Sequence, residues 1–305
     1  MKIGVVGAGG VGGYFGARLA QAGNEVGVVA RGDHLEAIRE HGLRVRSVFG
    51  DTTVAVAASA DPSDIGPCDV VLFCVKSYDT ESAATLLPPL LGDDGAVVSL
   101  QNGVDGEAAL AQVVGADRVI GGVAYIFSTV AEPGLIEHTG GPARLVFGEL
   151  DGQPSERTEQ LLSACQGAGI DAEIAEDIRV ALWTKFAFIC ATAGMTAATR
   201  LPLGDIRSSP ESWGMFASII DEVVELARRE GVPLPDGTSG QLIGGAAGLE
   251  PDSYSSLHHD LVTGRRMELE ALHGAVVARA NRLQLAVPSC EAINAILQPW
   301  ARRSA

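Results

Sequence analysis

The chain of 305 residues carries 38 acidic against 22 basic side chains, which gives a formal net charge of −16. This charge repels the phosphates of nucleic acids and of anionic lipid headgroups, so we expect neither a nucleic-acid partner nor a membrane partner. With 47% hydrophobic and 20% charged residues, the composition is typical of a globular enzyme with a sizeable core.

The first 175 residues alternate short β-branched runs with helical stretches. The predicted strands are residues 2–6, 25–30, 69–75 and 95–100. Helices are predicted between them, among others at 14–23 and 78–91. This alternation is typical of a parallel sheet covered by helices on both faces. Residues 43–48 and 52–58 are predicted to pair with each other in extended conformation, outside this alternation. Three further strands are predicted between residues 124 and 150 near the edge of the sheet.

After residue 177 the strands stop and nearly every segment has helical periodicity, including residues 180–199, 210–231 and 257–283. We therefore place a boundary near Asp177. The predicted architecture is an α/β domain of the Rossmann type over residues 1–176, with a doubly wound parallel sheet, followed by an all-α domain over residues 177–305.

The cysteines predict no metal site, because the five of them form neither a CxxC pair nor a zinc-type spacing with histidine. Most lie beside apolar residues, which favours reduced, buried thiols. The beginning of the chain lacks the charged, apolar and small-residue segments of a secretory signal, so we expect a cytoplasmic protein.

A glycine-rich segment follows the first predicted strand. Residues 7–12 read GAGGVG and match the dinucleotide-binding pattern GxGxxG, with a strand ending at Val6 and a helix beginning close to Gly10. Such glycines permit a tight turn and a close approach of the pyrophosphate, which the N–H groups at the helix start then bind. The residues predicted to bind the cofactor here are Gly7, Ala8, Gly9, Gly10, Val11 and Gly12.

The end of the second strand predicts which nicotinamide cofactor is used. An acidic residue there would bind the ribose 2′-hydroxyl of NADH, but this chain has Ala30 and Arg31. A guanidinium suits the 2′-phosphate of NADPH, which is therefore the expected cofactor. Asp33 lies two residues later and keeps NADH open as the alternative.

Lys185 is the only charged residue between positions 181 and 199. The segment barely reaches membrane-spanning length and carries this lysine, so we interpret it as a buried core helix. Burial among apolar side chains predicts a lowered pKa, which suits a proton donor near neutral pH. The alternative is a lysine whose stem lies on apolar surface with its ammonium group in water.

A partner for Lys185 is predicted in the segment GRRMELEALHGAVV. If this segment is a helix, its apolar residues at 269, 272, 276 and, further on, 283 form one stripe. Glu268 lies on the border of that stripe and Glu270 points nearly opposite, so Glu268 is the inward candidate. Arg265 also projects toward the stripe, which leaves a surface ion pair as the alternative.

Several motifs in order show that the chain resembles the ketopantoate reductases (2-dehydropantoate 2-reductases) over almost its whole length. The matching motifs are GAGGVG with Arg31, CVKSYDT at 74–80, LQNGV at 100–104, LWTK at 182–185 and YSSLHHDLVTGRRMELE at 254–270. The resemblance implies an NADPH-dependent reductase that transfers hydride to the keto carbon of a 2-oxo acid, as from 2-dehydropantoate to pantoate in pantothenate biosynthesis.

The resemblance also implies roles for individual residues. Lys76 and Asn102 would border the cofactor, with Asn102 near its nicotinamide end. Lys185 would be the proton donor to the keto oxygen, and Glu268 would orient that lysine or bind substrate. Ser256 would donate or accept a hydrogen bond to the substrate.

Two positions depart from the family's pattern. The family's lysine is typically followed, four and eight residues later, by asparagines that bind the substrate, whereas this chain has Ile189 and Ala193. A small-molecule ketone with a bulkier apolar group is therefore an alternative substrate.

Two other functions stay open. One is a non-catalytic NADPH-binding sensor or scaffold. The other is a hydroxyacid dehydrogenase of the same architecture, although the GxxxKxxxN pattern of those enzymes is absent around Lys185. The helical half, rich in alanine and leucine, could also offer a homodimer surface.

Overall fold

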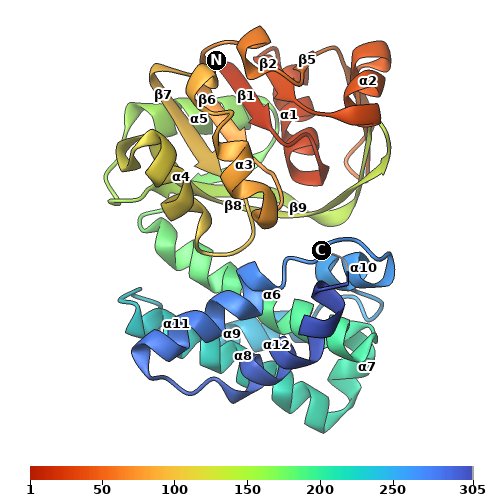
Figure 1. Ribbon diagram of the computed structural model, residues 1–305, viewed down its shortest axis with the longest axis vertical. Coiled ribbons are helices and arrows are strands. Elements are labelled where there is room, and N and C mark those ends of the chain that lie inside the picture. Colours follow the sequence, from red (N-terminus) through yellow and green to blue (C-terminus); the bar gives the residue numbers. More distant parts are fainter. Residues whose placement is uncertain (304–305) are drawn as a thin grey trace. The chain divides into compact units, whose positions relative to one another are not determined.

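The computed structural model describes residues 1–303 (Figure 1). The chain divides into two compact units. Unit 1 contains residues 1–101 and 105–178, and unit 2 contains residues 102–104 and the chain from Arg179 onward. Each unit has its own buried apolar core.

Unit 1 is built on one sheet. Its strands are β1 (Lys2–Val6), β2 (Glu25–Val29), β3 (Leu43–Ser47), β4 (Thr52–Val54), β5 (Ala57–Ser59), β6 (Cys68–Phe73), β7 (Leu91–Ser99), β8 (Val119–Glu132), β9 (Leu135–Glu149) and β10 (Asp171–Ile174). Their order is β4-β3-β9-β8-β7-β6-β1-β2-β5, and β10 pairs with β9. In the part of this order that runs from β8 through β7, β6, β1 and β2 to β5, every pair of neighbouring strands is parallel, which confirms the predicted α/β class.

Helices cover both faces of this sheet. They are α1 (Gly10–Gln21), α2 (Gly32–His41), α3 (Thr80–Ala84), α4 (Gly106–Val114) and α5 (Glu156–Gly167). Successive residues of a strand point to opposite faces, so Leu72 joins the core that contains Phe15 of α1, whereas Phe73 joins the core that contains Leu110 of α4. The helix predicted at 78–91 is much shorter than expected, because α3 ends at Ala84 and a 3-10 turn begins at Pro88.

The far part of the sheet is not wholly parallel, which corrects the sequence prediction. The three strands predicted between residues 124 and 150 form one long antiparallel hairpin of β8 and β9, with Ile120 opposite Glu149. The chain reverses at Pro133 and Gly134, where Gly134 has a φ of 75° that favours glycine. Within residues 43–58, β3 and β4 pair as predicted, and the structure shows that this pair is antiparallel, while β5 pairs with β2.

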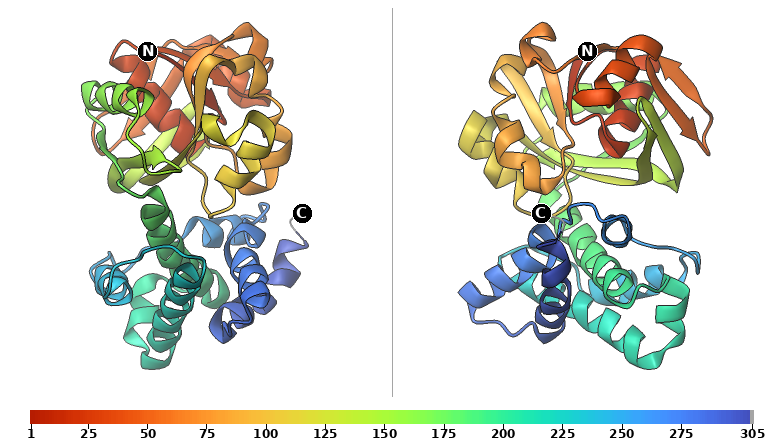
Figure 2. Two further views of the ribbon diagram at one scale, coloured as in Figure 1. Left: turned by 90° about the vertical axis from the view of Figure 1, so that its left-hand side faces the viewer. Right: turned by 45° about the vertical axis from the view of Figure 1, so that its right-hand side comes forward.

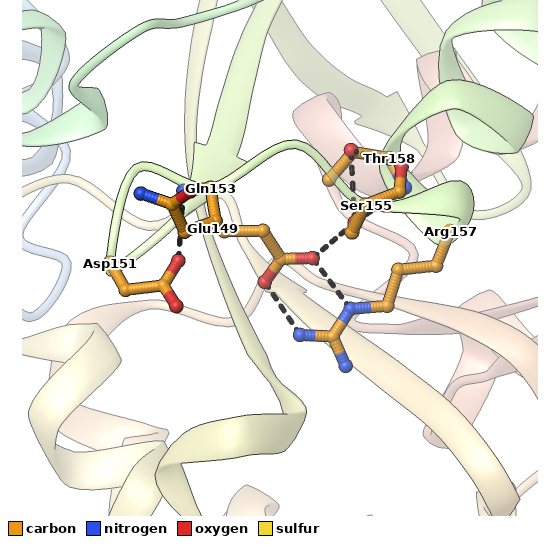
Figure 3. A network of polar contacts seen from close by, with 6 residues as sticks. All are labelled: Glu149, Asp151, Gln153, Ser155, Arg157 and Thr158. Atoms are coloured by element: carbon orange, nitrogen blue, oxygen red, sulfur yellow. Dashed lines mark hydrogen bonds and ion pairs between the residues drawn. The ribbon is translucent and has the colours of Figure 1, made fainter.

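A polar network holds the loop between β9 and α5 (Figure 3). Arg157 donates to both carboxylate oxygens of Glu149, with Nε–Oε1 at 2.7 Å and Nη2–Oε2 at 2.5 Å. Ser155 donates to Glu149 and caps α5 by accepting from the N–H of Thr158. Since the side chains of Glu149, Ser155 and Arg157 bond to one another, we assign this network to stability rather than to ligand binding.

The described residues of unit 2 form helices joined by loops (Figure 2). Its helices are α6 (Ile178–Thr199), α7 (Leu203–Ser208), α8 (Pro210–Arg229), α9 (Thr238–Ala247), α10 (Ser256–Val262), α11 (Ala275–Leu283) and α12 (Pro288–Ala301). Helix α8 packs against α7, α9, α11 and α12. It begins with Ser209 as its cap and Pro210 in the first turn, and it buries an apolar stripe that contains Phe216, Ile220 and Val223.

Within residues 1–303, α6 is long and apolar enough to cross a membrane by length and composition. However, 61% of its most apolar 18-residue window is buried inside the protein. This burial supports the predicted core helix.

Candidate active site

At one glycine of the glycine-rich loop, no other atom of the protein occupies the space beside the backbone. Gly7 has a φ of 94°, and a Cβ there would lie 2.9 Å from the backbone nitrogen of Val75. A Cβ on Gly12 would lie 2.3 Å from the carbonyl oxygen of Gly7. By contrast, a Cβ on Gly9 would meet no atom within 4 Å. The absence of a side chain at Gly9 therefore leaves open space beside the loop.

That space lies at the start of α1. The helix begins at Gly10 as predicted, with Gly9 at its N-cap and no side chain that caps it. Backbone N–H groups at a helix start bind anions, and a pyrophosphate needs a backbone that it can approach closely. The loop thus fits the pyrophosphate of a dinucleotide.

The β8–β9 hairpin explains the remaining glycines, which the sequence pattern alone did not. A Cβ on Gly10 would lie 2.3 Å from the carbonyl oxygen of Ser128, and a Cβ on Gly13 would lie 2.6 Å from Ile136. Both neighbours come from strands more than a hundred residues away. These two glycines let the hairpin pack against the first turn of α1.

Arg31 lies where the specificity residue was predicted, directly before α2. Its side chain is 88% exposed, and its Nη2 is 3.1 Å from Oδ2 of Asp79. Asp33, the alternative partner for a ribose, lies exposed in the first turn of α2. Asp79 is not among the residues predicted from the sequence, although it belongs to the CVKSYDT motif that follows β6. A guanidinium at this exposed position has the charge and geometry to bind a 2′-phosphate.

Gln101 joins the two loops that follow β6 and β7. Its Nε2 donates to the carbonyl oxygen of Val75 at 3.0 Å and to Oγ1 of Thr80 at 2.7 Å. These acceptors flank the segment that contains Lys76, which is half-buried. Gln101 also directly precedes Asn102. Gln101 is likewise not among the residues predicted from the sequence, although it belongs to the LQNGV motif.

Asn102 belongs to unit 2 with the two residues that follow it. Gly103 has a φ of 106°, and a Cβ there would lie 3.1 Å from the carbonyl oxygen of Ala271. Nη2 of Arg279 donates to the carbonyl oxygen of Val104 at 3.4 Å. The turn that carries Asn102 is therefore held by the helical region that follows Glu268.

Lys185 lies in the first half of α6, among the buried aromatic residues Trp183 and Phe186. Burial lowers the pKa of Lys185 to about 8, while the negative charge of Glu268 acts in the opposite direction. Lys185 is half-buried in the structure, and the carboxylate that acts on it belongs to the buried Glu268. A lysine in this environment gives up its proton far more readily than a lysine in water.

Glu268 is buried, with 6% of its surface exposed, whereas Glu270 is exposed and accepts from Gln298. The inward orientation of Glu268 is as predicted, but the reason is different. Residues 265–268 are not helical, since α10 ends before Gly264, which has a φ of 68°. Arg265 is exposed rather than directed inward.

The prediction of one continuous helix over residues 257–283 is therefore wrong. A π-helical turn spans Glu270–Gly274 and leads into α11. Leu283 is 39% exposed and does not belong to the buried stripe.

Ser256 is the first residue of α10 and is exposed. Its neighbour Ser255 caps the helix by accepting from the N–H of His258 at 3.1 Å. The Ser255 hydroxyl also lies 2.7 Å from Oγ1 of Thr196 on α6. The start of α10 is thereby fixed to the helix that carries Lys185.

The two departures from the family pattern lie on α6 in different environments. Ile189 is half-buried, whereas Ala193 is 3% exposed and belongs to the apolar core. Ala193 therefore does not contribute to the exposed surface of α6. Both positions present only hydrocarbon.

Within residues 1–303 no group of three or more His, Cys, Asp or Glu side chains could hold a metal ion. All five cysteines are free thiols, and four of them are buried, as expected. Burial raises the pKa of Cys68 to about 11, so this thiol stays protonated and unreactive at neutral pH.

Comparison with known proteins decides the family. The model of the ketopantoate reductase PanE/ApbA family matches residues 3–152, and the model of its C-terminal domain matches residues 177–300. This chain belongs to the ketopantoate reductase family. Ketopantoate reductases are oxidoreductases, and the two matched domains correspond to the α/β and the helical parts of the chain.

Individual relatives agree with this assignment. The 2-dehydropantoate 2-reductase of Mesorhizobium japonicum is 33% identical over 322 residues and covers 99% of this chain and 98% of its own. The crystal structure of a PanE/ApbA family ketopantoate reductase from Ralstonia eutropha has a TM-score of 0.91 at 36% identity, covering 100% of this chain and 99% of its own. D-mandelate dehydrogenase, in a structure with NADH and anilino(oxo)acetate, shares the fold with a TM-score of 0.90 at 20% identity, covering 99% of this chain and 98% of its own.

Proposed function

We propose that this protein is an NADPH-dependent reductase of a 2-oxo acid that carries an apolar substituent, with Lys185 as the proton donor. The observation that carries the proposal is the environment of Lys185, whose pKa is lowered to about 8 by burial beside Glu268. A general acid works best when its pKa is near the working pH. Membership of the ketopantoate reductase family supports the same chemistry.

The cofactor would be held by the residues named above. Backbone N–H groups of the loop at 7–12 would bind the pyrophosphate, Arg31 would bind the 2′-phosphate, and Lys76 and Asn102 would border the dinucleotide. NADPH supplies the hydride when it is bound.

The chain's own residues complete the reaction. Nζ of Lys185 would give a proton to the carbonyl oxygen of a substrate whose carbonyl carbon receives the hydride that NADPH supplies, and solvent would then reprotonate the neutral amine. Glu268 would keep the ammonium oriented, and Ser256 would hydrogen bond the substrate. A donor aimed at the developing alkoxide stabilises the transition state more than the ground state.

The direct test of this function is NADPH oxidation across a panel of 2-oxo acids and other ketones. We expect turnover with at least one 2-oxo acid and preference for a member with a larger apolar group. NADPH binding without any turnover would favour the non-catalytic sensor, which Ile189 and Ala193 keep open because both lack the polar groups that would bind a substrate.

The pH profile of the reaction tests the assignment of Lys185. Reduction requires the protonated amine, so turnover should fall above about pH 8 and approach a tenfold loss per pH unit. Replacing Glu268 with Gln removes the charge that raises the pKa of Lys185, so this loss should begin at lower pH in Glu268→Gln. A profile that stays flat between pH 7 and 10 would contradict the role of Lys185, as measured by turnover at saturating NADPH and substrate.

Arg31→Ala tests the choice of cofactor. If Arg31 binds the 2′-phosphate, this change should raise the Michaelis constant for NADPH at least about tenfold, or about 1.4 kcal/mol, and leave NADH use little changed. Arg39→Ala is the matched control, because Arg39 lies on α2, the helix that begins directly after Arg31, and its side chain bonds to the carbonyl oxygen of Ala58 and to Glu36. Equal losses with NADPH and NADH would contradict the phosphate contact.

A further inference from the structure

We propose that His34 is a positioning residue of the cofactor site, which orients the glycine-rich loop by hydrogen bonding to it. The proposal rests on the dinucleotide site described under the proposed function. His34 lies in the first turns of α2 and is half-buried. Its Nε2 is 2.7 Å from the carbonyl oxygen of Ala8, and its Nδ1 is 3.0 Å from the backbone nitrogen of Gly134.

These two contacts determine the state of the imidazole. The N–H of Gly134 can only donate, so Nδ1 of His34 must carry a lone pair and accept. The single hydrogen of the neutral ring is then on Nε2, which donates to the carbonyl oxygen of Ala8. Both nitrogens are used in one tautomer, and a protonated ring would have no acceptor for Gly134.

The contact with Ala8 sets the direction of a donor at the start of α1. The carbonyl of Ala8 and the N–H of Gly9 belong to the same planar peptide unit, where they point in opposite directions. Holding the carbonyl against His34 therefore fixes where the N–H of Gly9 points. Gly9 is the N-cap of α1 and the one glycine of the loop whose Cβ would meet open space, as shown above.

The same ring also joins three segments that are distant in sequence. Helix α2 begins directly after Arg31, the loop at 7–12 follows β1, and Gly134 lies in the turn between β8 and β9. One side chain thus sets the spacing between the loop expected to bind the pyrophosphate and the arginine expected to bind the 2′-phosphate. Preorganised donors bind an anion without the entropic cost of ordering the loop.

Two variants of equal length separate the hydrogen bond from simple packing. His34→Gln keeps an N–H that can reach the carbonyl of Ala8, whereas His34→Met has a similar length and no donor. His41→Gln is the matched control, because His41 lies on the same helix, is exposed and pairs only with the adjacent Glu40 among the described ion pairs. The dissociation constant of NADPH is measured by the change in its fluorescence on binding, and turnover is measured at saturating NADPH.

We expect His34→Met to raise the dissociation constant of NADPH at least about tenfold, and His34→Gln to stay within about threefold of the parent. In His34→Met, turnover at saturating NADPH should change much less than the dissociation constant does, because a residue that only positions the loop affects cofactor binding rather than the chemical step. If His34→Met does not fold, as judged by thermal unfolding, His34→Asn takes its place, because its shorter amide keeps an acceptor near the position of Nδ1 for Gly134 and places no donor at the position of Nε2.

The outcomes separate this inference from the proposed function. Equal affinity of the Met and Gln variants, or unchanged affinity of the folded variant without a donor, would overturn the role of His34 while NADPH binding by the parent stands. A parent protein that binds no nicotinamide dinucleotide would overturn the proposed function and this inference together.

Discussion

Lys185→Met should reduce turnover by about 10²–10⁴ while NADPH binding stays near that of the parent, because a positioned general acid contributes about that factor. The substitution keeps an unbranched side chain of similar length in the apolar surroundings of Trp183 and Phe186, so the helix loses a charge rather than its packing. The measurements are steady-state turnover on the best substrate of the panel and NADPH affinity by fluorescence.

Lys2→Met is the control for the loss of a lysine elsewhere. Nζ of Lys2 bonds to the carbonyl oxygen of Ile65 and pairs with Glu25, which are structural contacts of β1 and β2. This variant should keep its turnover. If Lys185→Met also turns over at the parent's rate, another group donates the proton and the mechanism proposed here is wrong.

Restoring polarity on α6 should redirect the specificity of the enzyme. The double change Ile189→Asn and Ala193→Asn is expected to shift the ratio of specificity constants toward ketopantoate by at least about tenfold, since one recovered hydrogen bond contributes about 1 kcal/mol or more. The two positions lie four residues apart on the helix, and Ile189 is four residues beyond Lys185. The measurement is kcat/KM for ketopantoate and for a bulkier apolar 2-oxo acid in parent and variant.

The structure shows which of the two changes is the safer one. Ile189 is half-buried and can present an amide to a substrate, whereas an amide at the buried Ala193 is costly unless it finds a partner. The single variant Ile189→Asn should therefore produce most of the shift, with Ile189→Leu as the apolar control. If the parent already reduces ketopantoate better than any other ketone of the panel, other residues bind its polar groups and the prediction fails.

Local patterns along the chain were sufficient for the α/β class of unit 1 and for the helical class of unit 2. The alternation of β-branched runs with helical stretches predicted a parallel sheet with two covered faces, because burial on both faces requires such runs. The context of GAGGVG predicted that β1 ends at Val6 and that α1 begins at Gly10, and both boundaries are confirmed. The isolation of Lys185 in an apolar segment predicted a lowered pKa, because desolvation depends mainly on the nearest side chains.

Contacts between distant segments decided the rest. The sequence does not state that Ser128 and Ile136 lie against Gly10 and Gly13, because such packing depends on how the β8–β9 hairpin turns back over α1. The contact of Asp79 with Arg31 and the two hydrogen bonds of His34 likewise join residues that are 26 to 100 positions apart. Glu268 is buried although its segment is not helical. The prediction from helical periodicity therefore gave the correct orientation, but helical periodicity is not its physical cause. Periodicity describes one element at a time, and only the tertiary structure specifies which elements meet.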